Sequence, residues 1–180
     1  MKKIIFFTIV IIVFIFLYVN VNASVDEIVI PDAAIRVRVI ANSNSIHDQN
    51  MKMKVKEYIE NNLSTLLLNV ENVDMARDII SNEVEILNVG INELFYENGY
   101  DMDFSINYGK NFFPEKDYKG VHYNAGEYES LVVTIGNGDG DNWWCVLFPP
   151  LCLLDADNAE EGNDVEYQFF VQKMIHRIFG

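Results

Sequence analysis

Basic side chains are scarce in this sequence: 13 lysines and arginines stand against 27 aspartates and glutamates, which gives the 180 residues a formal net charge of −14. This balance argues against nucleic acid as a partner, because phosphates require a basic protein face. It argues equally against docking on anionic lipid headgroups. An acidic surface of this kind mainly favours solubility.

Histidine and cysteine are scarce as well, and both are zinc ligands. His47, His122 and His176 lie in three different segments without ligand spacing, so we expect neither a metal site nor a cofactor. The sequence also lacks a recognisable set of acid, nucleophile and positioning residue. It therefore predicts no catalytic residues, and we expect that the protein is not an enzyme.

A long apolar run stands near the N-terminus. Two lysines precede the apolar residues 4–19, and Val21-Asn22-Ala23 supplies the small residues of a signal peptidase site. We expect a signal peptide over residues 1–23; an uncleaved anchor is the alternative, because the run is only slightly shorter than a membrane span. In either case the body of the chain lies outside the membrane, and it is long enough for one compact domain.

Alternating apolar and polar side chains predict about four strands in this body, at residues 35–41, 102–108, 128–135 and 143–148. In the first strand the alternation places Ile35, Val37 and Val39 on one face. Arg36 and Arg38 fall on the other face. Each strand therefore has one side suited to a core.

Helical spacing of apolar residues predicts two long helices between the first two strands. The first follows the capping box formed by Ser45 and Asp48, and the second runs from about Val73 to a stop at Gly99. The fold class is thus a two-layer α+β domain over residues 24–154, with a mixed or antiparallel sheet and both helices on one face. The other face stays partly open. Residues 155–180 form an acidic linker and a C-terminal amphipathic helix.

Two connecting segments carry unusual compositions. Residues 109–126 are too long for an ordinary hairpin and rich in aromatic side chains, which predicts a functional loop. The three glycines of residues 136–140 precede a tryptophan-rich strand, where a phosphate-binding loop would need a helix, so we expect a flexible hairpin turn. Acidic and amide side chains between these glycines leave a weak, exposed calcium site as an alternative, although the glycine and glutamate of an EF-hand are missing.

Three blocks in the same order resemble the stage II sporulation protein R family, secreted signalling proteins of endospore-forming bacteria. The blocks are IPDAAIRVRVIANS at 30–43, followed by Asp48, Gln49 and residues 52–55; AGEYESL at 125–131; and GNGDGDNWWCVLFPPLC at 136–152. The resemblance implies export from the forespore into the space between the two membranes of the sporangium. There, such proteins activate a membrane-embedded aspartic protease of the mother cell, which removes the pro-sequence of a sigma factor. Contact with the membrane would come only through the N-terminal segment or this receptor.

A second class of function remains open, namely a cell-wall-binding module or a peptidoglycan-directed hydrolase in the septal space. Glu127, Glu129 or Asp48 would then supply acid and base, and aromatic side chains would stack on sugars. Glycosidase carboxylates usually come from different segments that flank a cleft, and neighbouring exposed glutamates on a strand are common. The sequence therefore favours the signalling class.

The candidate recognition surface combines three groups of residues. Arg36 and Arg38 form structural ion pairs with Glu127 or Asp32, or they bind a carboxylate-bearing partner. Polar residues cluster where the first strand meets the first helix, and the aromatic loop together with both tryptophans would form an apolar patch for the receptor. The candidate partner-binding residues are Arg36, Arg38, Asn42, Ser43, Asp48, Gln49, Lys52, Phe113, Tyr118, Glu127, Tyr128, Asn142, Trp143 and Trp144.

Cys145 and Cys152 are the two cysteines of the chain. Outside the cytoplasm a disulfide can persist, so they form an intramolecular bridge or, alternatively, stay as two buried thiols. Pairing either cysteine with His122 as a protease is only a bare possibility, because the flanking sequence contains no nucleophile motif.

Overall fold

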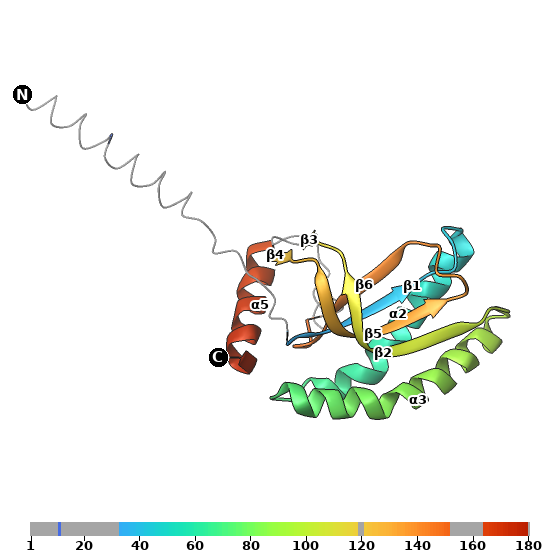
Figure 1. Ribbon diagram of the computed structural model, residues 1–180, viewed down its shortest axis with the longest axis horizontal. Coiled ribbons are helices and arrows are strands. Elements are labelled where there is room, and N and C mark those ends of the chain that lie inside the picture. The colour runs from blue at the N-terminus through green and yellow to red at the C-terminus, as the bar shows by residue number, and fades with distance from the viewer. Residues whose placement is uncertain (1–10, 12–32, 119–120, 152–163, 180) are drawn as a thin grey trace, which may run out of the picture.

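The computed structural model describes residues 11, 33–118, 121–151 and 164–179, and Figure 1 shows how their helices and strands are arranged. The elements are β1 (Ile35–Ile40), α2 (Ile46–Leu67), α3 (Val73–Glu97), β2 (Phe104–Phe113), β3 (Lys116–Tyr118), β4 (Val121–Tyr123), β5 (Gly126–Ile135), β6 (Asn142–Phe148) and α5 (Asp164–Phe179). Apart from residue 11, the predicted signal segment lies outside the described residues, as does the predicted linker up to residue 163. Among the helices described, none has the length and apolar character that crossing a membrane requires.

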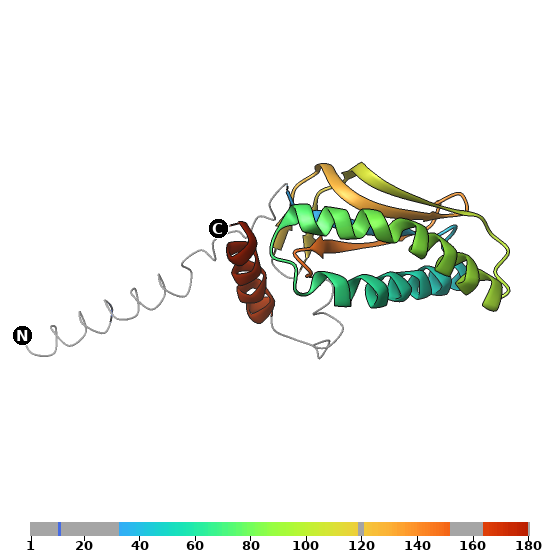
Figure 2. The ribbon, with the colours of Figure 1, turned by 90° about the horizontal axis from the view of Figure 1, so that it is seen from below.

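The predicted two-layer α+β architecture is confirmed. Four strands form a mixed sheet in the order β2-β5-β1-β6, in which β1 is parallel to β5 and antiparallel to β6. The strand β2 is antiparallel to β5 along its whole length. Both long helices lie side by side against one face of this sheet, as Figure 2 shows.

The core forms between the sheet and these two helices. In β1 the side chains of Ile35, Val37 and Val39 are at most 1% exposed and face α2 and α3. The helices contribute buried residues such as Ile59 and Leu87 to the same cluster. Each fully buried aliphatic side chain of this kind contributes about 1.5–3 kcal/mol of transfer free energy. The alternation seen in the sequence therefore decides which side of β1 the helices cover.

Helix boundaries follow from capping residues. The hydroxyl of Ser45 accepts a hydrogen bond from the backbone N–H of Asp48 at 3.1 Å, as the capping box predicts. At the start of α3, the side-chain oxygen of Asn72 accepts from the N–H of Met75 at 2.9 Å. Gly99, with φ of 59°, follows the end of α3, which confirms the predicted stop.

The prediction that the glycine-rich segment forms a hairpin turn is wrong. The strands β5 and β6 do not pair with each other, because β1 lies between them and pairs with both. Residues 136–141 instead cross the carboxyl end of β1, where the N–H of Gly140 donates to the carbonyl of Ala41 at 2.9 Å. We call residues 136–141 the crossing segment.

The prediction that residues 109–126 form a long irregular loop is also wrong, and their functional role stays a prediction. The strand β2 continues to Phe113 and pairs with β5 as far as Gly126. The short strands β3 and β4 then form a separate antiparallel pair at one end of the sheet (Figure 1). The aromatic side chains of this stretch therefore belong to strands and not to an irregular loop.

The C-terminal helix α5 runs from Asp164 to Phe179, within residues 155–180, where the sequence predicts a linker and an amphipathic helix. Its residues Met174 and Ile175 pack against a small second cluster of buried residues, which includes Ala34 and Val146. Figure 1 shows α5 at the end of the sheet near β4. This helix docks on its own domain, as an amphipathic terminal helix more often does.

Candidate functional site

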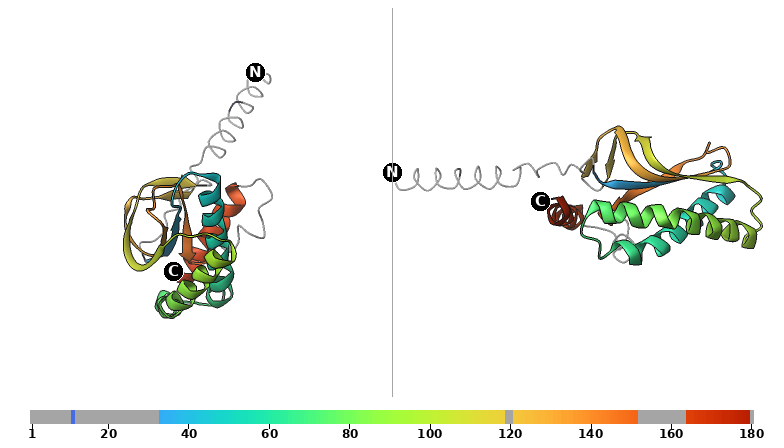
Figure 3. Two further views of the ribbon diagram at one scale, coloured as in Figure 1. Left: turned by 90° about the vertical axis from the view of Figure 1, so that its right-hand side faces the viewer. Right: turned by 60° about the horizontal axis from the view of Figure 1, so that its bottom comes forward.

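The sheet has a second face, opposite α2 and α3, and we call it the open face (Figure 3, right). Because side chains alternate along a strand, the register determines which residues point to it. These residues are Arg36, Arg38 and Ile40 of β1; Ser105, Asn107, Asn111 and Phe113 of β2; Tyr128, Ser130, Val132 and Thr134 of β5; and Asn142, Trp144 and Val146 of β6. None of these strand side chains is acidic, since Glu127 and Glu129 point to the helix side of β5.

Arg36 lies inside an aromatic cage at one end of the open face. Its guanidinium carbon is 3.3 Å from the centre of the Tyr128 ring, and the rings of Phe113, Tyr123 and Trp144 have their centres 5.3–5.9 Å from it. The arginine is only 1% exposed. A cation held over aromatic faces and out of water gains about 2 kcal/mol from each good contact. Arg36 is therefore a structural centre of the open face, inaccessible to a large partner.

Arg38 lies two residues further along β1, and its environment differs. It is half-buried, and its Nε atom is buried without a hydrogen-bond partner within the described part of the chain. Its guanidinium carbon is 5.8 Å from the centre of the Phe113 ring. Burial lowers the pKa of the Arg38 guanidinium, because removal from water disfavours its charged form.

Glu127, one of the two carboxylates that the sequence suggests as ion-pair partners of these arginines, pairs with neither of them. Glu127 is exposed and points to the helix side of β5, away from both guanidinium groups. Asp32, the other suggested partner, lies outside the described residues. For Arg38, no described carboxylate lies within ion-pair distance.

Polar groups extend the open face from the cage across β2 and β5. The side-chain amide of Asn111 donates to the hydroxyl of Ser130 at 3.0 Å and to the side-chain oxygen of Asn107 at 3.3 Å. Lys116 of β3 places its ammonium nitrogen 5.1 Å from the centre of the Trp144 ring. The open face thus combines aromatic, amide and cationic groups.

The two tryptophans point in opposite directions, so the single apolar patch predicted for them does not form. Trp143 is half-buried against the helix-side core, and the ammonium of Lys56 lies 5.3 Å from the centre of its ring. Trp144 points to the open face and makes edge-to-face contacts with Phe113 and Tyr123. Adjacent residues of a strand face opposite sides of its sheet, which explains the separation.

The polar cluster predicted between the first strand and the first helix does come together, around Asp48. This carboxylate accepts hydrogen bonds from the hydroxyls of Ser43 at 2.6 Å and Tyr100 at 2.7 Å, and from the side-chain amide of Asn42 at 3.0 Å. These bonds, led by the one from Ser43, lower the pKa of Asp48 from 3.8 to about 2. Burial and the bond to Asp48 raise the pKa of Tyr100.

The same cluster ties the crossing segment to α2. The backbone oxygen of Asp141 accepts from the side-chain nitrogens of Gln49 at 3.4 Å and Lys52 at 3.3 Å. The side-chain oxygen of Asn42 accepts from the N–H of Asn137 at 3.1 Å. Most polar groups of these residues are thus engaged with one another, and Asp48 and Lys52 are each only 7% exposed. This cluster stabilises the junction; its role in recognition stays a prediction.

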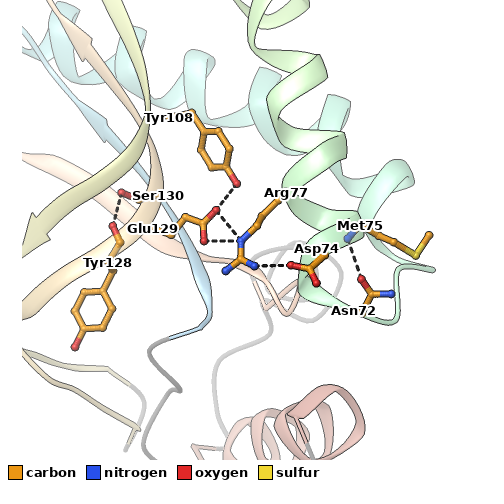
Figure 4. Close-up of polar contacts among 8 residues, drawn as sticks. All are labelled: Asn72, Asp74, Met75, Arg77, Tyr108, Tyr128, Glu129 and Ser130. Atoms are coloured by element: carbon orange, nitrogen blue, oxygen red, sulfur yellow. Dashed lines mark hydrogen bonds and ion pairs between the residues drawn. The ribbon is translucent and has the colours of Figure 1, made fainter.

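Glu129 lies in a third cluster, which joins α3 to the sheet (Figure 4). Its two oxygens accept from the Nε of Arg77 at 2.9 and 3.1 Å, and one of them accepts from the hydroxyl of Tyr108 at 2.7 Å. Arg77 also pairs with Asp74 at 2.6 Å. The bond to Glu129 raises the pKa of Arg77, and burial raises the pKa of Tyr108.

The carboxylates considered for sugar chemistry do not form one site. Asp48 lies beyond the carboxyl end of β1, whereas Glu129 lies near the amino end of the parallel strand β5. Each is engaged in the hydrogen bonds of its own cluster. Glu127 points to the helix side without a hydrogen bond or ion pair to any described residue. This arrangement gives no paired acid and base across a cleft.

The remaining predicted residues are spread over the sheet. Phe113 and Tyr128 belong to the aromatic cage, and Asn142 is exposed at the start of the edge strand β6. Tyr118 ends β3, but its side chain lies outside the described part of the chain. Cys145 is disulfide-bonded. Cys152 lies outside the described residues, so the bridge between the two cysteines stays a prediction.

Sequence reasoning missed Tyr100, Arg77 and Tyr108. Tyr100 comes directly after the Gly99 stop, and no local pattern links it to Asp48, 52 residues earlier. Arg77 lies on a helix and Tyr108 on a strand, so their meeting at Glu129 depends on how α3 packs on the sheet. An acid and a base on different elements carry no sequence signal of contact.

Comparisons with known proteins place this chain among sporulation proteins. The family model described as stage II sporulation protein R matches residues 31–158. Stage II sporulation protein R of Bacillus subtilis (strain 168) is 37% identical over 151 residues, which cover 84% of this chain and 67% of that relative. No solved structure matches the chain.

Proposed function

The chain belongs to the stage II sporulation protein R family, and from this premise we propose that it is a secreted signal that the forespore sends to the mother cell. Membership supports a role in sporulation signalling. The finer proposal is that the exported protein activates a membrane-embedded aspartic protease, which then processes a pro-sigma factor. The space between the forespore and mother-cell membranes is the proposed location.

One observation carries this proposal: the family match covers all six strands and both long helices. It therefore includes the whole open face and the Asp48 junction, while α5 lies beyond it. The family resemblance belongs to the folded domain and not to a short motif. Binding by a surface of that domain is then the simplest way in which the chain can act.

The polar clusters favour binding over catalysis. Asp48 and Glu129 each accept several hydrogen bonds that hold elements together, and they lie at opposite ends of the sheet. A general acid or base must reach a substrate proton. Carboxylates that are tied into the fold in this way are poorly placed for that task.

The proposed function is tested by reconstitution in a host that does not sporulate. The full chain, the candidate membrane protease and its pro-sigma substrate are expressed together, and sigma processing is followed by immunoblot. We expect the shortened sigma factor only when all three proteins are present. A version without residues 2–23, which should stay in the cytoplasm, is expected not to activate the protease.

Two results would contradict the proposal. One is an unprocessed sigma factor in cells where the full chain is folded and exported. The other is processing that does not depend on the chain. In a parallel assay with purified peptidoglycan, released fragments or co-sedimentation would favour the wall-directed alternative.

A further inference from the structure

We propose that the open face binds an acidic, extended segment of a partner protein, and that the guanidinium of Arg38 receives one of its carboxylates. The inference deepens the proposed function by assigning the chemistry of the partner contact. It rests on that function only for the identity of the partner. The binding itself follows from the arrangement of charges and side chains on the sheet.

Arg38 differs from two other arginines in having no ion pair within the described part of the chain. Arg77 pairs with Glu129 and Asp74, and Arg177 pairs with Glu71. Arg38 has no such carboxylate among the described residues, and its Nε atom is buried without a hydrogen bond there. A cation partly removed from water is destabilising unless hydrogen bonds and an opposite charge compensate it. A ligand carboxylate would supply both, in the two-pronged geometry that guanidinium groups favour.

Apolar and amide side chains flank Arg38 on the open face. Its register partners are Val132 on β5 and Trp144 on β6, and both point to the open face. Asn107 of β2 is the register partner of Val132, because β2 pairs with the other edge of β5. Val132 is buried, so an extended segment crossing the strands would place an apolar side chain on the partly exposed Trp144. Its backbone could form hydrogen bonds with the exposed amide of Asn107.

Charge complementarity also favours an acidic partner. The whole chain has a formal charge of −14, but none of the side chains that β1, β2, β5 and β6 present to the open face is acidic. The net charge of the chain repels an acidic segment, whereas the partly exposed guanidinium of Arg38 attracts it locally. Such a distribution selects the docking site and the orientation of the partner. Burial lowers the pKa of the Arg38 guanidinium, and a carboxylate beside it would raise that pKa again.

A protein segment fits this face better than an anionic membrane. A membrane presents a broad negative surface, which the net charge of the chain opposes. A single extended segment has only to reach Arg38 and its neighbours. We therefore assign the open face to a protein partner and treat anionic lipid as a competing outcome of the test.

The test is an NMR titration of the full chain, 15N-labelled and held in non-ionic detergent, with the peptide acetyl-Glu-Val-Glu-Val-Glu-Val-amide. The Nε–H signal of Arg38 is identified by its loss in Arg38→Met, a variant that keeps most of the apolar stem. We expect the peptide to shift this signal and to bind at least tenfold more weakly to Arg38→Met. Binding should also weaken as salt is added.

Three controls decide the outcome. The matched peptide with glutamine in place of glutamate should leave the Arg38 signal in place, and Arg177→Met, which removes an exposed arginine of α5, should bind the acidic peptide normally. The proposal is overturned if both peptides shift the signal equally or if neither does. It is also overturned if vesicles of phosphatidylglycerol shift the signal while the acidic peptide does not.

The same variants separate this inference from the proposed function. In the reconstituted processing assay, folded Arg38→Met should lower sigma processing at least tenfold, while Arg177→Met should leave it unchanged. Normal processing by Arg38→Met would overturn the assignment of the open face to the partner. If the unaltered chain binds the acidic peptide but fails to activate the protease, the proposed function fails and the binding site stands.

Discussion

Asp48 shows how a single carboxylate can hold three parts of this molecule together. From the first turn of α2, its carboxylate accepts hydrogen bonds from Asn42 and Ser43, which follow β1, and from Tyr100, which follows α3. Asn42, which donates to it, also accepts a hydrogen bond from the crossing segment. The low pKa of Asp48, about 2, records that these bonds favour the ionised carboxylate.

Replacing Asp48 with asparagine should therefore destabilise the fold. Removal of the charge weakens several hydrogen bonds at once, and we expect the free energy of unfolding at pH 7 to fall by about 1–3 kcal/mol. The folded-state pKa lies below the ordinary 3.8, so the stabilisation is complete above that value and disappears as the pH falls through 3.8 toward 2. Asp48→Asn should accordingly flatten the dependence of stability on pH in this range.

Urea unfolding followed by circular dichroism at pH 7, 5, 4 and 3 measures both effects. Asp139→Asn is a suitable control, because Asp139 is an exposed aspartate of the crossing segment. The control should keep the stability and pH dependence of the unaltered protein. An Asp48→Asn variant whose stability still falls as steeply with acid would contradict the role given to this carboxylate.

At the scale of residues, the sequence predicts contacts that are local and misses those that are not. Ser43, Asp48 and Gln49 lie within one strand end and one helix start, so their meeting follows from short separations along the chain. Tyr100 joins them only because α3 returns to the same end of the sheet. The opposite orientation of Trp143 and Trp144 could have been predicted, since it follows from the alternation of side chains along a strand.

Among the elements, the crossing segment has the strictest geometric requirement. A Cβ atom built on Gly140 would lie 2.4 Å from the carbonyl oxygen of Ser43, which is backbone and has little room to move. Only a residue without a side chain allows the segment to pass so close to the end of β1. The glycine is required by this close approach and not by a hairpin.

Gly140→Ala should therefore destabilise the protein by more than about 1 kcal/mol, because the native backbone cannot accommodate the added methyl group. Gly109→Ala is the matched control: a Cβ atom there would have its nearest neighbour at 3.7 Å, an ordinary contact. Thermal and urea unfolding of both variants provide the measurement. Equal stability of Gly140→Ala and the unaltered protein would mean that the crossing segment does not pack as described.

Element type was largely predictable, while element order was not. The capping box at Ser45, the stop at Gly99 and the alternation in β1 each depend on a few neighbouring residues, and the structure confirms them. The hairpin failed because consecutive strands were assumed to pair, whereas β1 separates β5 from β6. The second half of β2 was missed because its strand character depends on pairing with residues 126–130 of β5.

At the scale of the whole molecule, the inner strand β1 is well shielded from solvent, whereas the helix α5 at one end of the sheet is less shielded. β1 is flanked by a strand on each side and by the helices beneath, whereas α5 packs at the sheet end through Met174 and Ile175 on a small cluster and Ile178 on the main core. Stability in such a domain is uneven, and weakly packed elements open locally.

Hydrogen–deuterium exchange should therefore divide the chain into two classes. We expect the amides of β1 and of its neighbour β5 to exchange most slowly, through global unfolding, and those of α5 and of the β3–β4 pair to exchange faster through local opening. Mass spectrometry of proteolytic peptides measures this directly. Equal protection of α5 and β1 would show that the C-terminal helix is an integral part of the core.

The position of β1 also bears on the order in which the protein is made. β1, one of the two inner strands of the sheet, is translated before β5 and β6, which flank it. Arg36 therefore lacks its register partners Ser130 and Val146 until those strands have been made. Contacts so distant along the chain delay closure of the sheet until synthesis is nearly complete. If the protein leaves its cell through a translocation channel, as we propose, we expect this delay to keep the polypeptide unfolded during export, so that folding is completed on the far side of the membrane.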